Sequence, residues 1–244
     1  MNYSYYIFLH GNPGSPLDFD PLIKDLNLQN AQVLMPDLMT STDSIAIVLK
    51  TIKSVKADQK ISVTIIAYSW GAYLACKLIA DNNFNQIAIC SKLVLVSPYM
   101  KNESKLSAFG KFLFKIWGFN WLLAGVLKSK LKKSFLSKSF GLQQDIIPQH
   151  NHQILSKSRT WLKAVDNKNR QEENPISLII DIPTLVIYSK DDSAMKTVDQ
   201  LSVVETYCSN HTTVHWFAGN HALIQTRHHD VAEEIKLFTN QNTL

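Results

Sequence analysis

The sequence predicts an α/β fold in which a mostly parallel, doubly wound sheet of about six strands carries helices on both faces. Short apolar runs rich in β-branched residues alternate along the chain with longer segments of helical periodicity. That alternation is typical of parallel strands joined by crossover helices. The strand candidates are continuously apolar instead of alternating with polar residues, as expected for strands buried on both faces.

The expected elements follow one another in a regular order. A capping-type Ser-Thr-Asp-Ser run precedes the first long helix, and a Ser-Lys-Asp-Asp-Ser run precedes a later one. We expect strands at Tyr5–Leu9, Ala31–Met35, Ile61–Tyr68, Lys92–Ser97, Thr184–Tyr188 and Thr213–Phe217, and helices at Ser44–Val55, Ala72–Ala80, Met195–Tyr207 and His221–Phe238.

The alternation is interrupted once, between Pro98 and Pro175, where only helix-like segments rich in Lys, Phe and Trp occur. We interpret residues 99–175 as an inserted helical cap, or lid, over the strand ends, where open α/β sheets bind ligands. Residues 1–98 and 176–244 would then form the core. A length of 244 residues fits one domain with such an insertion.

Composition excludes several classes of protein. Hydrophobic residues make up 45% of the chain and charged residues 18%, which is enough apolar material for a large core. Three widely spaced cysteines indicate neither a disulfide framework nor a zinc site, so no metal or cofactor is implied. The first ten residues lack the pattern of a secretory signal, and the longest apolar segment, Ile116–Leu127, is too short to cross a bilayer. We therefore expect a cytoplasmic protein without a transmembrane segment, by default a monomer.

The run "VTIIAYSWGAYLACKLIA" places Ser69 between a predicted strand and a predicted helix. A nucleophilic serine at such a sharp turn needs small residues two positions before and after it. These are Ala67, which adds a methyl group where glycine is usual, and Gly71. The motif is an acceptable variant, and alone it is a weak signal.

A nucleophilic serine also needs a base and an acid that orients the base, because a free hydroxyl is protonated at neutral pH. His221 lies just past a strand end in a "GNH" turn, which makes it the candidate base. The turn "SKDD" after the preceding strand offers two acids. Its last residue, Asp192, is favoured, and Asp191 remains the alternative.

An oxyanion hole is expected from two backbone N–H groups. One belongs to Trp70, the residue after the serine. The other is assigned to Asn12 in the glycine-bearing loop "LHGNPGSP", Leu9–Pro16, which follows the first strand. This loop lacks the lysine and the glycine spacing of a phosphate-binding loop.

Together these motifs resemble the α/β-hydrolase family of the serine esterase type, including the carboxylesterases that demethylate pimeloyl-carrier proteins. "HGNPGSP" resembles the family's oxyanion loop, "AYSWGA" its elbow, "YSKDD" its acid turn and "GNH" its histidine turn. The resemblance spans nearly the whole chain outside the cap. It implies that Ser69, Asp192 and His221 form a catalytic triad and that Asn12 and Trp70 supply the oxyanion donors. The antiparallel strand pair that usually opens this fold is missing or reduced.

The expected function is therefore a serine hydrolase that cleaves a carboxylic ester through an acyl-enzyme on Ser69. Haloalkane dehalogenases and epoxide hydrolases use an aspartate nucleophile, so a serine at position 69 disfavours both. Three alternatives stay open: a hydrolase similar to the proline iminopeptidases, one similar to the lipases, and a non-catalytic ligand-binding protein on the same scaffold.

Charge is concentrated in the predicted cap. Residues 99–175 contain fourteen Lys or Arg against five Asp or Glu, whereas the whole chain carries a net charge of +5. A basic segment of this kind attracts anionic partners. With its many aromatic residues, it favours an acyl ester on an acidic acyl-carrier protein, a lipid ester at an anionic surface or a small carboxylate-bearing ester. Nucleic acid is not expected, because no base-reading element accompanies the charge.

Overall fold

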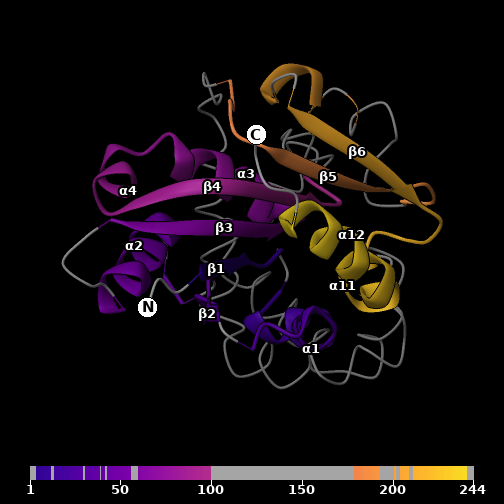
Figure 1. Ribbon diagram of the computed structural model, residues 1–244, viewed down its shortest axis with the longest axis horizontal. Coiled ribbons are helices and arrows are strands. Elements are labelled where there is room, and N and C mark those ends of the chain that lie inside the picture. The colour runs from indigo at the N-terminus through magenta and orange to yellow at the C-terminus, as the bar shows by residue number, and fades with distance from the viewer. Residues whose placement is uncertain are drawn as a thin grey trace, which may run out of the picture.

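The computed structural model describes residues 4–11, 14–29, 31–38, 40–41, 43–55, 60–99, 179–192, 201, 204–208 and 211–240. Within these ranges the strands form one sheet in the order β2-β1-β3-β4-β5-β6, and each neighbouring pair is parallel (Figure 1). The strands are β1 (Ser4–Leu9), β2 (Ala31–Leu34), β3 (Ile61–Tyr68), β4 (Ala88–Val96), β5 (Thr184–Ser189) and β6 (Thr212–Phe217). The predicted parallel sheet and all six predicted strands are confirmed.

Helices cover both faces of the sheet, as the doubly wound class requires. One face carries α2 (Ser44–Ser54), α3 (Trp70–Ile79) and α4 (Asn82–Ile87), and the other carries the 3-10 helix η1 (Pro16–Phe19), α1 (Asp20–Leu26), α11 (Leu223–Thr226) and α12 (His228–Asn240). Figure 1 shows that α1 lies beside α11 and α12, although these helices come from opposite ends of the sequence.

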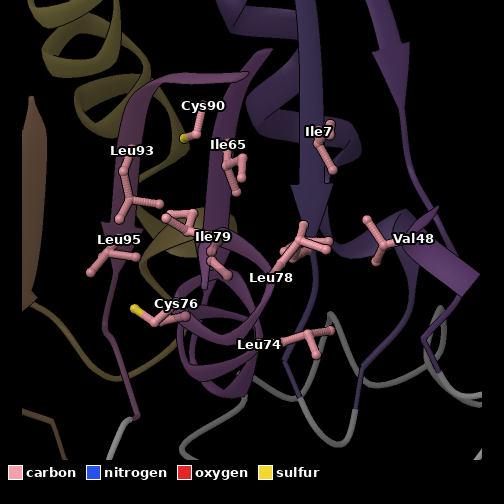
Figure 2. Close-up of a cluster of buried hydrophobic side chains, with 14 of the residues drawn as sticks. Ile7, Val48, Ile65, Leu74, Cys76, Leu78, Ile79, Cys90, Leu93 and Leu95 are labelled. Carbon is pink, nitrogen blue, oxygen red and sulfur yellow. The ribbon is translucent and has the colours of Figure 1, made fainter. Parts of the chain in front are cut away.

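Each face of the sheet has its own apolar core. Figure 2 shows the first core, in which side chains of β1, β3 and β4 meet those of α2 and α3. The second lies between the sheet and the helices α1, α11 and α12. Ile65 points into the first core and Ile66 into the second. Because β3 is buried on both sides, it reads as an uninterrupted apolar run in the sequence.

One strand begins earlier than the sequence indicated, and one helix was not predicted. Strand β4 starts at Ala88 instead of Lys92, and its pairing with β3 shifts register between Val63 and Thr64, which accommodates one extra residue in β4. Helix α4 before it was not predicted, because "NNFNQI" is polar and rich in asparagine. The Asp81 carboxylate starts this helix by accepting the N–H groups of Asn83 and Phe84.

The predicted single helix His221–Phe238 is wrong. The chain instead forms the short α11 and then α12, and His221 lies before both. The break occurs at Arg227, whose backbone leaves helical geometry at φ −130° and ψ 30°. Its side chain donates to Asp230 at 2.6 Å and to the Ala218 carbonyl at 3.0 Å, which holds this residue at the junction.

Most of the predicted cap lies outside the described residues, which include only its first position, Tyr99. The helix predicted at 195–207 is described only at residue 201 and residues 204–207, all of them helical. In the parts of the chain that the structure describes, no helix has both the length and the apolar character needed to cross a membrane.

Candidate active site

The C-terminal ends of β3, β5 and β6 bring three predicted site residues to one edge of the sheet. Ser69 directly follows β3, Asp192 lies three residues after β5, and His221 lies four residues after β6. Since all strands run in the same direction, their carboxyl ends share one edge, where open α/β sheets bind ligands.

These side chains form a continuous chain of hydrogen bonds. His221 Nε2 lies 2.8 Å from Ser69 Oγ, and His221 Nδ1 lies 2.7 Å from Asp192 Oδ2. An ionised carboxylate can only accept, so the proton of the neutral imidazole belongs on Nδ1. The lone pair of Nε2 then faces the Ser69 hydroxyl, as needed to remove its proton. The Asp192 side chain is only 1% exposed, which strengthens this interaction.

Asp191, the alternative acid, has a different partner. Its carboxylate accepts the Gly219 N–H at 3.0 Å, and its own N–H donates to the Gly219 carbonyl at 3.1 Å. The Ser189 hydroxyl donates to the same carbonyl. Gly219 adopts φ +138°, a conformation that glycine tolerates best. Asp191 therefore secures the turn that leads to His221, while Asp192 contacts the imidazole.

The turn at Ser69 is a strained elbow. Ser69 has φ 52° and ψ −122°, an unfavourable backbone conformation for a residue with a side chain. Its N–H donates to the Val96 carbonyl at 3.0 Å. A Cβ at position 71 would lie 2.1 Å from the Leu9 carbonyl oxygen, so only glycine fits there. Ala67, in contrast, is fully buried in the first core, and its methyl group is accommodated.

The loop after β1 packs against this elbow. A Cβ at Gly11 would lie 3.0 Å from the Ser69 Cβ, so the loop backbone touches the serine side chain. His10 is fully buried. Its Nδ1 lies 2.8 Å from the Gly11 carbonyl oxygen, and its Nε2 accepts the Leu38 N–H at 3.0 Å. It thereby ties the loop to the segment after β2. Sequence reasoning missed this role, although a histidine right after a buried strand was a usable signal.

The two predicted oxyanion donors differ in how far the structure describes them. Trp70 is the first residue of α3, so its backbone N–H lies at the positive end of that helix dipole. Its side chain is buried in the first core. Asn12 lies outside the described residues.

Sequence reasoning also missed the buried acid Asp18, which contacts the same loop after β1. The Asp18 carboxylate accepts the Ser15 N–H at 2.9 Å, as in a capping box. A Cβ at Gly14 would lie 2.7 Å from its Oδ2. Burial raises the pKa of Asp18 from 3.8 to about 7, despite the opposing hydrogen bonds from Ser15.

Asp18→Asn should change how stability depends on pH. Because the pKa is higher in the folded state, the folded protein binds this proton more tightly between pH 3.8 and about 7. The wild type therefore loses stability as pH rises through that window, by at most about 1.4 kcal/mol per pH unit. The amide keeps the shape of the group and does not ionise. We expect the variant to gain stability relative to the wild type from pH 5 to pH 8.

Urea unfolding of both proteins at several pH values measures this difference. Other titrating groups cancel in the comparison. A constant offset between the two proteins at every pH would contradict the assignment to Asp18.

Among the described residues, no group of three or more His, Cys, Asp or Glu side chains could hold a metal ion. Burial raises the pKa of Cys76 and raises that of Cys90 to about 12. Both side chains are therefore protonated thiols at neutral pH, unsuited to nucleophilic or metal chemistry.

The parallel sheet, the strained elbow and the serine, histidine and aspartate at successive strand ends define an α/β-hydrolase. A family model described as "Serine aminopeptidase, S33" matches residues 24–225, and the chain belongs to this family of hydrolases. No curated protein sequence matches the chain.

Solved structures agree on the fold. A laboratory-evolved variant of potato epoxide hydrolase is similar with a TM-score of 0.74 and 15% identity, covering 99% of this chain and 93% of that one. A putative lipase from Acinetobacter baumannii has a TM-score of 0.70, 14% identity and coverage of 98% and 83%. A thermophilic esterase from Thermogutta terrifontis has a TM-score of 0.65, 13% identity and coverage of 98% and 90%. At these identities the likeness concerns the fold alone.

Proposed function

We propose that this α/β-hydrolase is a serine carboxylesterase in which Ser69 is the nucleophile, His221 the base and Asp192 the orienting acid. The observation that supports this proposal is the pair of hydrogen bonds, 2.8 Å and 2.7 Å long, that links the three side chains. Epoxide hydrolases attack with an aspartate, and position 69 holds a serine. Ester cleavage is therefore favoured over the reaction of the epoxide hydrolases among the structural neighbours.

The first half of the reaction forms the acyl-enzyme. Ser69 Oγ attacks the ester carbonyl carbon while His221 Nε2 takes the hydroxyl proton. Negative charge develops on the carbonyl oxygen, and the N–H groups of Trp70 and Asn12 are the proposed donors to it. When the tetrahedral intermediate collapses, the bond to the alcohol oxygen breaks, and His221 returns its proton to the leaving alkoxide.

The second half releases the acid. His221 removes a proton from water, and the resulting hydroxide attacks the acyl carbon. The bond to Ser69 Oγ breaks, and Nε2 returns the proton to the serine. Asp192 stabilises the imidazolium that forms twice in each cycle, because its carboxylate lies against Nδ1.

Ser69→Ala should abolish reaction with a fluorophosphonate probe. The probe bonds covalently to an activated serine hydroxyl, and the variant has no such atom at position 69. Mass spectrometry of intact wild-type and variant protein after exposure measures the labelling. The wild type should gain the mass of one probe molecule less HF, because fluoride leaves as the serine oxygen bonds to phosphorus, and the variant should gain none; equal labelling of both would remove Ser69 from this role.

A second candidate function is aminopeptidase activity, which the description of the matching family favours. The same serine and histidine could cleave an amide bond, with the departing amine protonated by His221. Parallel assays with p-nitrophenyl esters of graded acyl length and with aminoacyl p-nitroanilides separate the two functions. Ester cleavage at least about 100-fold faster in kcat/KM is expected if the protein is a carboxylesterase, and preference for the anilides would reverse the assignment.

We further propose that the basic segment 99–175 recruits an acyl ester carried on an acidic carrier protein. Charge complementarity raises the rate of encounter and is screened by salt. With a methyl ester bound to a carrier protein, kcat/KM should fall steeply between 50 mM and 500 mM salt, while a free p-nitrophenyl ester should respond little. Equal salt responses of the two substrates would contradict the docking proposal.

A further inference from the structure

Ser97, the residue after β4, has an unusual backbone conformation. The described residues include three non-glycine residues with positive φ: Asn27, Ser69 and Ser97. Asn27 ends helix α1, a common place for the left-handed conformation. Ser97, at φ 43°, ends no helix and precedes Pro98, and a proline disfavours helical-type conformations in the residue before it. Such a conformation persists only where its surroundings enforce it.

The surroundings of Ser97 hold it firmly. The residue is completely buried, and its N–H donates to the Ile187 carbonyl of β5 at 2.8 Å. The Ser97 hydroxyl has no hydrogen-bond partner among the described residues, although it is buried. Both the backbone conformation and the lone hydroxyl are unfavourable. The position is therefore not explained by the stability of the fold.

The chain stays bonded to the candidate nucleophile on both sides of Ser97. The Val96 carbonyl accepts the Ser69 N–H at 3.0 Å, and the Tyr99 N–H donates to the Ser69 carbonyl at 3.1 Å. An extended chain would carry residue 99 about 10 Å beyond residue 96. In a regular parallel ladder the two bonds to one residue come from residues two positions apart on the neighbouring strand, so the bend at Ser97 must absorb one extra residue for both bonds to form.

We propose that Ser97 is a positioning residue, whose left-handed turn lets residues 96 and 99 clamp the backbone of Ser69 in its strained conformation. The inference rests on the proposed function, because it acts through Ser69 as the nucleophile. The Ser69 carbonyl also accepts the first-turn Ala72 N–H at 3.0 Å. Without the Tyr99 bond the elbow can relax, which moves Oγ away from His221 Nε2. A displacement near 1 Å can lower kcat by about 100-fold.

Two substitutions at position 97 separate the effect of the backbone turn on activity from the effect of the hydroxyl. Ser97→Gly removes the hydroxyl and tolerates positive φ, whereas Ser97→Thr keeps the hydroxyl and disfavours positive φ because of its branched Cβ. We expect kcat of the glycine variant to stay within about threefold of the wild type and kcat of the threonine variant to fall at least about 10-fold, with little change in KM. The rate constant of fluorophosphonate labelling, measured well below the unfolding temperature of each variant, should follow kcat.

A second pair of variants tests the hydrogen bond from the Tyr99 N–H to the Ser69 carbonyl directly. This pair decides the question even if the threonine variant does not fold. Tyr99→Pro and Tyr99→Ala both remove the tyrosine side chain, but only proline lacks the N–H that bonds the Ser69 carbonyl. The proline variant should show kcat at least about 10-fold below that of the alanine variant. Thermal unfolding of each variant verifies that the protein measured is folded.

The outcomes are distinct. A glycine variant that loses as much activity as the threonine variant would overturn the inference, because tolerance of positive φ would then not preserve activity. A loss in the glycine variant alone would assign the role to the hydroxyl and would also overturn the inference. Equal kcat for folded proline and alanine variants at position 99 would do the same. If wild-type protein is not labelled by the probe at all, the proposed function fails first. If it is labelled and these patterns are absent, only the role of Ser97 fails.

Discussion

Asp192→Asn should lower kcat by about 10⁴-fold and leave the protein folded. The carboxylate now accepts the Nδ1 proton of His221 at 2.7 Å and so keeps the lone pair of Nε2 toward Ser69. An amide can instead donate to Nδ1, which moves the imidazole proton to Nε2 and leaves no base for the serine. It also cannot neutralise the imidazolium that forms during the reaction. Steady-state kinetics with a p-nitrophenyl ester measures the effect.

Asp191→Asn is the matched control. This aspartate lies next to Asp192 in the same turn, and its carboxylate accepts the Gly219 N–H at 3.0 Å. The amide oxygen of asparagine can accept the same bond, so the loss of kcat should be less than about 10-fold. The pair compares identical chemistry at adjacent positions, and only one of these positions touches the imidazole.

Thermal unfolding of both variants separates catalysis from folding. If Asp191→Asn loses more activity than Asp192→Asn while both stay folded, the assignment of the acid is wrong. If both keep nearly full activity, neither aspartate orients the base.

The sheet could be predicted from the sequence for one physical reason, which also explains why the three predicted site residues lie together. Strands buried on both faces must be continuously apolar, so they are visible in the sequence. Their carboxyl ends must meet at one edge because all neighbours are parallel. A polar residue just past a strand end is therefore placed by the strand itself, and Ser69, Asp192 and His221 are all of this kind.

Residues that matter because of a contact made in the folded protein have no comparable pattern in the sequence. His10 matters because its ring accepts the Leu38 N–H, and Ser97 matters because of the path it gives the chain toward Ser69. Asp18 is an ordinary acid in the sequence until burial raises its pKa to about 7. The break of the last helix likewise depends on Arg227 reaching the Ala218 carbonyl across the preceding turn. These contacts depend on the assembled fold and not on local periodicity.

The two small residues that flank Ser69 look equivalent in the motif, but the structure separates them. Gly71 sits where the first turn of α3 crosses the end of β1, and a Cβ there would meet the backbone of Leu9 and His10 at 2.1 Å to 2.9 Å. Backbone atoms held in a central strand cannot yield as a flexible side chain can. Ala67 is the next-to-last residue of β3 and pairs in register with Leu9 and Leu95. Its methyl group packs in the first core.

Gly71→Ala should therefore destabilise the protein by about 3 kcal/mol or more and lower kcat of the folded fraction by at least about 100-fold. The added methyl group must push α3 away from β1, which displaces both Trp70 and the loop that begins at His10. The matched control is Ala67→Gly, which removes a methyl group on the other side of the serine. It should cost only about 1 to 2 kcal/mol and keep kcat within about 10-fold, because no contact in the turn is strained.

Urea unfolding measures the stability of both variants, and the rate of fluorophosphonate labelling reports the geometry of Ser69 in the molecules that remain folded. A Gly71→Ala protein as stable as Ala67→Gly would mean that α3 and β1 are not in close contact at this point. A Gly71→Ala protein that is destabilised but labelled at the wild-type rate would mean that the close approach serves the fold alone. The expected combination of lost stability and slow labelling would tie the packing of β1 against α3 to the reactivity of the serine between them.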